Sequence, residues 1–220
     1  MNQRTDFSRH IRHIALAANL VALSSTAAWA APEAQFQTAF KHFIQASSGD
    51  TAAIEQAAEA FSSLLKDEPA NPVLMAYAGS ATSMKATTTM LPWKKMNYAE
   101  DGLAQLDKAL ALLGPAHDAP VQNGTPGVLE VKFVASNTFL AVPGFMNRHE
   151  RGAKLLGEVV QHPLLATAPL PFRGSVWLTA AKEANKAKNT TEAKRYLGLI
   201  VQQQAPQATQ AQAMLKTLAI

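Results

Sequence analysis

Cysteine is absent from this chain of 220 residues. The absence excludes disulfides, thiol catalysis and an N-terminal lipid attached through a cysteine thiol. A domain of this size buries enough apolar surface to fold without covalent cross-links. We therefore expect non-covalent packing to hold the fold together.

Signatures of catalysis are also missing. The sequence contains no H-E-x-x-H, G-x-S-x-G, G-x-x-x-x-G-K-[ST] or G-x-G-x-x-G motif, which are patterns of zinc peptidases, serine hydrolases and nucleotide-binding folds. An S-x-x-K pattern occurs at Ser63 to Lys66. Its usual partners, S-D-N and K-T-G, are absent, so we interpret it as a chance match. We expect no catalytic residue, no cofactor and no enzymatic activity.

Histidines are few, and after the first 30 residues they are isolated. No pair has the one-turn helical spacing that presents two imidazoles to one metal ion. These residues are His42, His117, His149 and His162. The sequence therefore predicts no metal site.

A long hydrophobic run is lacking as well, because spanning a bilayer takes about 20 consecutive apolar residues. The apolar stretch from Ile14 to Ala28 is shorter, and it contains Asn19 and three hydroxyl residues. Arginines precede it and Ala28-Trp29-Ala30 follows it, which is the arrangement of a secretory signal peptide. An uncleaved anchor is the alternative reading.

Processing at this site divides the chain into a leader, residues 1–30, and a single domain, residues 31–220. Cleavage is expected after Ala30. We expect the product to be periplasmic or secreted, with no stable membrane insertion after cleavage.

The positive charge is small once the leader is removed. The chain has 20 Lys and Arg against 16 Asp and Glu; the leader takes three Arg and one Asp, which leaves 17 against 15. Nucleic-acid binding usually requires a basic surface interleaved with aromatics, so we expect no nucleic-acid partner. A local basic cluster fits either a solvated helix face or a site for an acidic partner. It consists of Lys182, Lys186, Lys188, Lys194 and Arg195.

What the chain has in abundance is apolar residues at helical spacing, with little of the alternation typical of strands. The pattern predicts an all-α fold of about nine helices, paired as antiparallel hairpins. Asp50 and Asn71-Pro72 are helix-start signals. The predicted helices cover about 33–46, 50–68, 72–87, 96–113, 125–142, 145–161, 173–186, 190–204 and 208–218.

Within these hairpins small and large residues recur at a regular spacing. One copy of the pattern consists of Trp177, Ala180, Ala181, Ala184, Ala193 and Leu197, and another includes Ala57, Phe61, Leu64 and Pro69. This spacing resembles the tetratricopeptide repeat family. An unrelated helical bundle would show similar periodicity, so both readings stay open. The resemblance implies stacked hairpins forming a degenerate α-solenoid, in which the first helix of each hairpin lines a concave face. It directs Ser80, Ser83, Ser175, Lys182 and Asn185 toward that face.

Two segments combine an apolar anchor with cations, which is typical of interface hot spots. Trp93 with Lys94 and Lys95 forms the first; Phe145 and Met146 with Arg148 and Arg151 form the second. Alternatively, Trp93 and Phe145 are hydrophobic plugs that close the ends of hairpins.

Together these observations favour an exported, non-enzymatic binding or scaffold protein for a peptide or protein partner in the cell envelope. The predicted partner-binding residues are Trp93, Lys94, Lys95, Ser83, Lys182 and Asn185. A small-ligand carrier or an enzyme, with its site between hairpins, is the alternative. A structural envelope component is the third possibility.

Overall fold

The computed structural model describes residues 33–218, and within that range it contains nine α-helices and no strand. The predicted all-α fold is therefore confirmed, while the predicted leader and its cleavage site lie outside the described residues. The helices are α1 (Glu33–Ser47), α2 (Thr51–Asp67), α3 (Pro72–Met84), α4 (Pro92–Ala111), α5 (Gly127–Ala141), α6 (His149–Gln161), α7 (Leu170–Lys186), α8 (Thr190–Gln202) and α9 (Ala208–Thr217).

Two helices begin where their capping residues predict. The Asn71 side chain accepts hydrogen bonds from the backbone N–H groups of Val73 at 3.0 Å and Leu74 at 3.2 Å, and Pro72 is the first residue of α3. Asp50 accepts in the same way from Ala52 at the start of α2. Such caps satisfy backbone donors that have no partner within the helix.

Three other predicted starts are wrong, and one of them is that of α7, which begins at Leu170 rather than near Arg173. Helix α4 begins at Pro92 rather than near Met96, because proline fits the first helical position, and α3 has already ended at Met84. Helix α6 begins at His149 rather than at Phe145. Asn147 has a left-handed φ of 53°, which interrupts the chain between a short 3₁₀ turn at Gly144–Met146 and α6.

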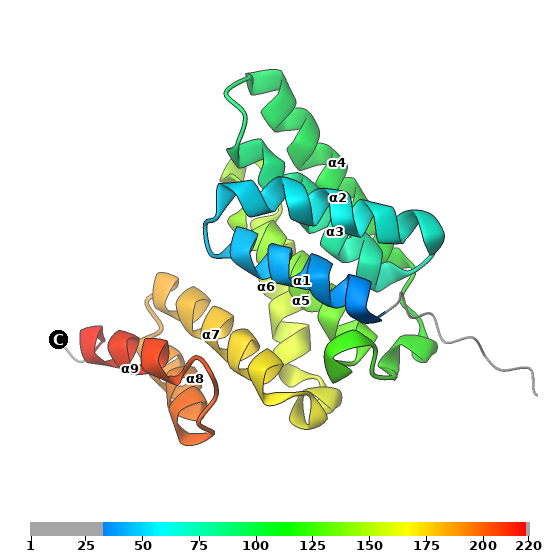
Figure 1. Ribbon diagram of the computed structural model, residues 1–220. Coiled ribbons are helices and arrows are strands. Elements are labelled where there is room, and N and C mark those ends of the chain that lie inside the picture. Colours follow the sequence, from blue (N-terminus) through cyan, green and yellow to red (C-terminus); the bar gives the residue numbers. More distant parts are fainter. Residues whose placement is uncertain (1–32, 219–220) are drawn as a thin grey trace, which may run out of the picture.

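Consecutive helices pack in pairs: α1 with α2, α3 with α4, α5 with α6, and α7 with α8. Helix α3 also packs against α1, α2 and α5, so it lies at the centre of the first half of the molecule. In Figure 1, α1 to α4 form one end of the molecule and α7 to α9 the other. The last helix, α9, packs on α8.

The buried residues form two main cores. The first is rich in aromatic rings: Phe61 stacks on Tyr77 with ring centroids 4.7 Å apart, and Phe36 meets both rings edge-on. The second core, around Trp177, Leu197 and others of α5 to α9, is mainly aliphatic.

Glycines allow a close crossing between α3 and α4. A Cβ atom added at Gly79 would lie 2.8 Å from the carbonyl oxygen of Gly102, and one added at Gly102 would overlap Ser83 Oγ and the carbonyl oxygen of Gly79. The two backbones can approach this closely only because both positions lack a side chain.

Candidate functional site: an apolar groove

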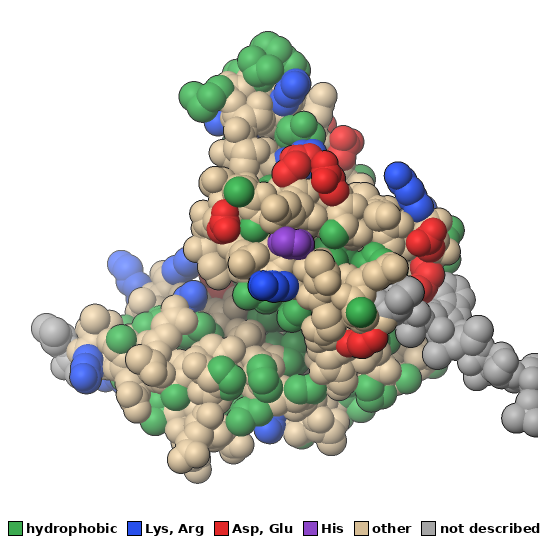
Figure 2. Space-filling model, viewed as in Figure 1, with side chains coloured by type: hydrophobic (Ala, Val, Ile, Leu, Met, Phe, Trp, Pro, Cys, Tyr) green, Lys and Arg blue, Asp and Glu red, His purple; other side chains and the backbone are tan. Residues whose placement is uncertain are grey.

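A groove with a cavity volume of about 1080 Å³ runs between α1, α3, α5 and α7. Figure 2 shows it as a hollow between α1 and α7, with hydrophobic side chains visible inside. The start of α4 and the chain from Ala141 to Met146 complete its wall. The first helix of each packed pair therefore contributes to one continuous surface.

The wall of the groove is mainly apolar because these helices carry apolar residues on more than one face. Helix α1 buries Phe36 and Ala39 in the core and still presents Phe40 and Ile44 to the groove. On the opposite side, Phe133 of α5 contacts Phe172 of α7 edge-to-face at 5.3 Å between ring centroids. The groove offers an occupant aromatic and aliphatic contacts over most of its length.

Two pairs of hydroxyl and amide groups of the groove are bonded to each other. Thr138 Oγ1 donates to Ser80 Oγ at 2.8 Å, which joins α5 to α3, and Thr179 Oγ1 lies 3.2 Å from the Asn137 side-chain oxygen, which joins α7 to α5. Ser83 Oγ is buried beside Gly102 and has no hydrogen-bond partner in residues 33–218. These pairs tie the helices together and leave few polar groups directed at an occupant.

Charge in the groove has a single sign. Lys95 from α4 and Lys182 from α7 are the charged residues among the described lining, and no acidic residue of residues 33–218 lines it. Figure 2 shows further lysine or arginine side chains gathered beside the C-terminal end of α7. An occupant with a negative group is therefore favoured at either lysine.

A buried acidic pair lies behind the groove wall. The Tyr77 hydroxyl, whose ring lines the groove, donates to Glu130 Oε1 at 2.6 Å, and both residues are buried. Burial raises the pKa of Glu130 to about 8, although the Tyr77 hydrogen bond opposes the shift. Burial and the neighbouring carboxylate raise the pKa of Tyr77 well above its ordinary value. The Glu130 carboxyl is therefore mostly neutral at pH 7.

Sequence reasoning missed this pair because its members lie 53 positions apart. A signal was present: Glu130 stands alone within the apolar run Val128-Leu129-Glu130-Val131. A carboxyl in such a run must be buried with a partner or neutralised.

The structure brings together three of the six predicted partner-binding residues: Ser83, Lys95 and Lys182 line the groove. Asn185 is exposed further along α7 and does not line it. Trp93 and Lys94 are exposed on the first turn of α4, outside the described lining.

Ser80 and Ser175, which the resemblance also directs to a concave face, line the groove too. The Ser175 hydroxyl accepts a hydrogen bond from Gln207 Nε2 at 2.9 Å, so it also helps to hold the start of α7 against the chain before α9.

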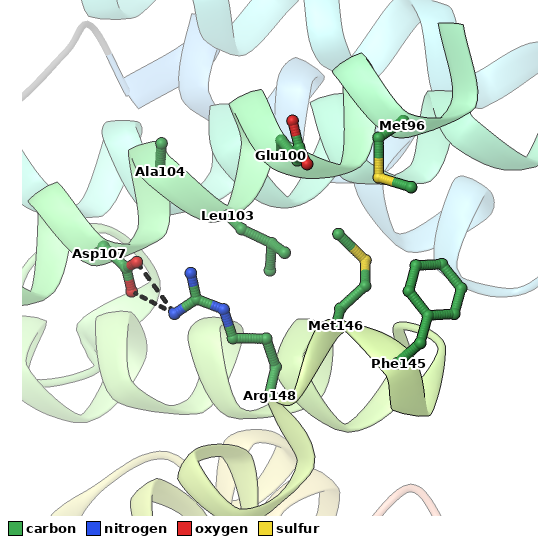
Figure 3. A pocket seen from close by; sticks show the side chains of 8 residues that line it. All are labelled: Met96, Glu100, Leu103, Ala104, Asp107, Phe145, Met146 and Arg148. Carbon is green, nitrogen blue, oxygen red and sulfur yellow. Dashed lines mark hydrogen bonds and ion pairs between the residues drawn. The ribbon is translucent and has the colours of Figure 1, made fainter. Parts of the chain in front are cut away.

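The alternative in which Trp93 and Phe145 plug the ends of hairpins is wrong, because these side chains are 62 % and 68 % exposed. Phe145 stands between the groove and a smaller pocket of about 350 Å³ on the other side of α4 (Figure 3). Met96 and Met146 also line both cavities. The side chains of Phe145, Met96 and Met146 therefore separate the groove from the smaller pocket.

The arginines of the second predicted segment have partners within the protein. Arg148 Nη1 lies 3.0 Å from Asp107 Oδ2 of α4 (Figure 3), and Arg151 pairs with the same carboxylate. Both guanidinium groups also stack over the buried ring of Phe139, at 5.5 and 5.2 Å from its centroid. These cations join α6 to α4 and are less available to a partner than Lys94 or Lys95.

Within residues 33–218, no helix has the length and hydropathy needed to cross a bilayer. The same part of the chain contains no cluster of three or more His, Cys, Asp or Glu residues that could hold a metal ion. In comparisons with protein-family models, curated proteins and solved structures, the chain has no significant match.

Proposed function

We propose that this protein is an exported, non-enzymatic binding protein whose groove holds an apolar segment of a peptide or protein partner in the cell envelope. The observation that carries the proposal is the lining of the groove: α1, α3, α5, α7 and the start of α4 supply a mainly apolar surface, and its charged groups are Lys95 and Lys182. A segment with apolar residues and an acidic residue or carboxyl terminus complements such a surface.

The proposed architecture is a degenerate tetratricopeptide-like solenoid. Three observations support it: consecutive helices pack in pairs, the first helix of each pair lines the groove, and glycines allow the close crossing of α3 and α4. In such an array the concave face is the binding face.

A small-ligand carrier is the second candidate, and the size of the cavity favours it. Its volume of about 1080 Å³ is near the upper end for small-molecule sites, which span roughly 300 to 1,000 Å³. With lysine as its only charge, the groove would accept an amphiphile such as a long-chain carboxylate.

Competition against an anionic, apolar dye distinguishes these candidates. Anilinonaphthalene sulfonate should become fluorescent in the groove, because its rings find an apolar wall and its sulfonate a lysine. We expect a peptide of leucines and phenylalanines with a glutamate to displace the dye, while dodecanoate displaces it poorly.

Displacement of the dye by dodecanoate but not by the peptide would support the carrier instead.

Lys182→Glu should weaken the binding of both the peptide and the dye, since it replaces a groove cation with an anion. The matched control is Lys216→Glu, which makes the same charge change at an exposed residue of α9 outside the groove lining. Equal effects of the two variants would count against the groove as the binding site.

A further inference from the structure

A second surface, which adjoins the groove wall at Pro92 and Lys95, is formed by residues 90–95 at the start of α4, here called the α4 tip. Met90 is 88 % exposed, Trp93 62 % and Leu91 38 %. Figure 1 shows the start of α4 extending beyond the layer of α1 to α3, and Figure 2 shows hydrophobic side chains at this projecting end. The α4 tip is thus convex and apolar.

Folding does not explain these side chains. Pro92 stands at the first position of α4, where proline favours a helix start, and Met90, Leu91 and Trp93 belong to neither of the two main cores of the described residues. Contiguous exposed apolar residues on a water-soluble domain mark a surface that meets another apolar phase or partner.

The charged residues of the chain segment that forms and precedes the α4 tip are all basic. Between Lys85 and Tyr98 the chain has three lysines and no acidic residue. Lys85 is engaged by Glu55 at 2.8 Å, whereas Lys94 and Lys95 form no ion pair with any described residue. Lysines in the first turn of a helix are also unfavourable toward the helix dipole, so helix stability does not account for them.

Tryptophan, flanking aliphatic residues and adjacent lysines are the composition that binds at the boundary between lipid headgroups and acyl chains. The projecting shape suits a flat bilayer, which a concave site would not contact. The unpaired lysines complement anionic phospholipids.

We propose that the α4 tip docks this protein on the surface of an anionic phospholipid bilayer. Met90, Leu91 and Trp93 enter the headgroup boundary, and Lys94 and Lys95 contact lipid phosphates. Because Lys95 and Met96 also line the groove, docking places one end of the groove at the membrane. The proposal does not depend on what the groove binds.

Vesicle co-sedimentation tests it. The protein is recovered from the periplasmic fraction of an expressing bacterium, and its intact mass establishes whether the leader is present. It is then mixed with vesicles of phosphatidylethanolamine and phosphatidylglycerol, or of phosphatidylcholine alone. We expect binding to the anionic vesicles, much weaker binding to the neutral ones, and weakening by salt.

Variants of the α4 tip give the expected size of the effect. The double variant Lys94→Ala, Lys95→Ala should lower partitioning about 30-fold, which corresponds to about 1 kcal/mol for each lysine near the surface. Trp93→Ala should lower it about tenfold. The charge-matched control Lys154→Ala, Lys216→Ala alters exposed lysines elsewhere and should change it little.

Tryptophan fluorescence locates the contact. In protein whose mass shows that the leader, with Trp29, is absent, Trp93 is exposed and Trp177 is buried, so a blue shift on adding anionic vesicles reports Trp93. Trp93→Phe should abolish the shift but retain most co-sedimentation. The proposal is overturned if anionic vesicles do not bind, or if the α4 tip variants sediment like the parent protein. It is equally overturned if those variants still bind anionic vesicles but no longer bind a protein partner solubilised in detergent. The α4 tip would then be a protein-binding surface.

Discussion

Helix α3 and the start of α4 are neighbours in the chain and both are rich in apolar residues, yet their environments are opposite. Every residue of α3 from Pro72 to Ala81 is buried, whereas Leu91 to Asn97 are all exposed. The difference lies in what surrounds the apolar residues: α3 has no charged residue, and the start of α4 has two lysines. Apolar composition alone therefore does not separate a core helix from a binding surface, but adjacent unpaired charge does.

The sharpest form of this comparison is a pair of aromatic truncations. Phe36→Ala removes a fully buried ring that packs on α3 through Tyr77 and should lower the free energy of unfolding by about 3 to 5 kcal/mol. Trp93→Ala removes an exposed ring and should change it by no more than about 0.5 kcal/mol. Urea denaturation followed by circular dichroism measures both. A large loss from Trp93→Ala would show that the α4 tip is structural after all.

The crossing of α3 and α4 gives the next largest effect. Gly102→Ala should cost about 3 kcal/mol, because the new Cβ would overlap Ser83 Oγ and the Gly79 backbone, which can move only if the helices separate. Gly157→Ala, in α6, is the matched control: nothing lies within 4 Å of its Cβ position. That variant should gain about 0.5 to 1 kcal/mol from helix propensity. If both glycines behave alike, the close approach is not a determinant of stability.

The buried pair that joins α3 to α5 predicts a pH dependence. Glu130 binds its proton more tightly when folded, with a pKa raised from 4.5 to about 8, so the unfolded state releases that proton first. Stability should therefore fall as pH rises from about 4.5 to 8, with a slope of at most about 1.4 kcal/mol per pH unit from this group. Glu130→Gln should remove this contribution. Unfolding titrations in which the variant and the parent keep the same slope would assign the pH dependence to other groups.

Local signals in the sequence predicted most of the fold and only part of the groove. The Asp50 and Asn71 caps placed two helix starts correctly, because a cap acts on backbone groups within three residues. Pro92 misled the prediction because proline was interpreted as a helix breaker, whereas here it occupies the first position of α4.

The groove residues were also predicted only in part. The resemblance to tetratricopeptide repeats implies one face for Ser83, Lys182 and Asn185; the first two line the groove and Asn185 does not. The Tyr77–Glu130 pair depends on how α3 packs against α5, a contact between distant parts of the chain that no local pattern encodes.

Blocking the groove tests most directly whether it binds an apolar segment. Ala141 is an exposed residue of the groove lining, and Ala111 is an exposed residue at the end of α4 outside it. Ala141→Trp should fill the groove and abolish binding of the apolar, glutamate-containing peptide, measured by calorimetry, while Ala111→Trp should bind as the parent protein does. Peptide binding that survives Ala141→Trp in a correctly folded variant would show that the groove is not the binding site.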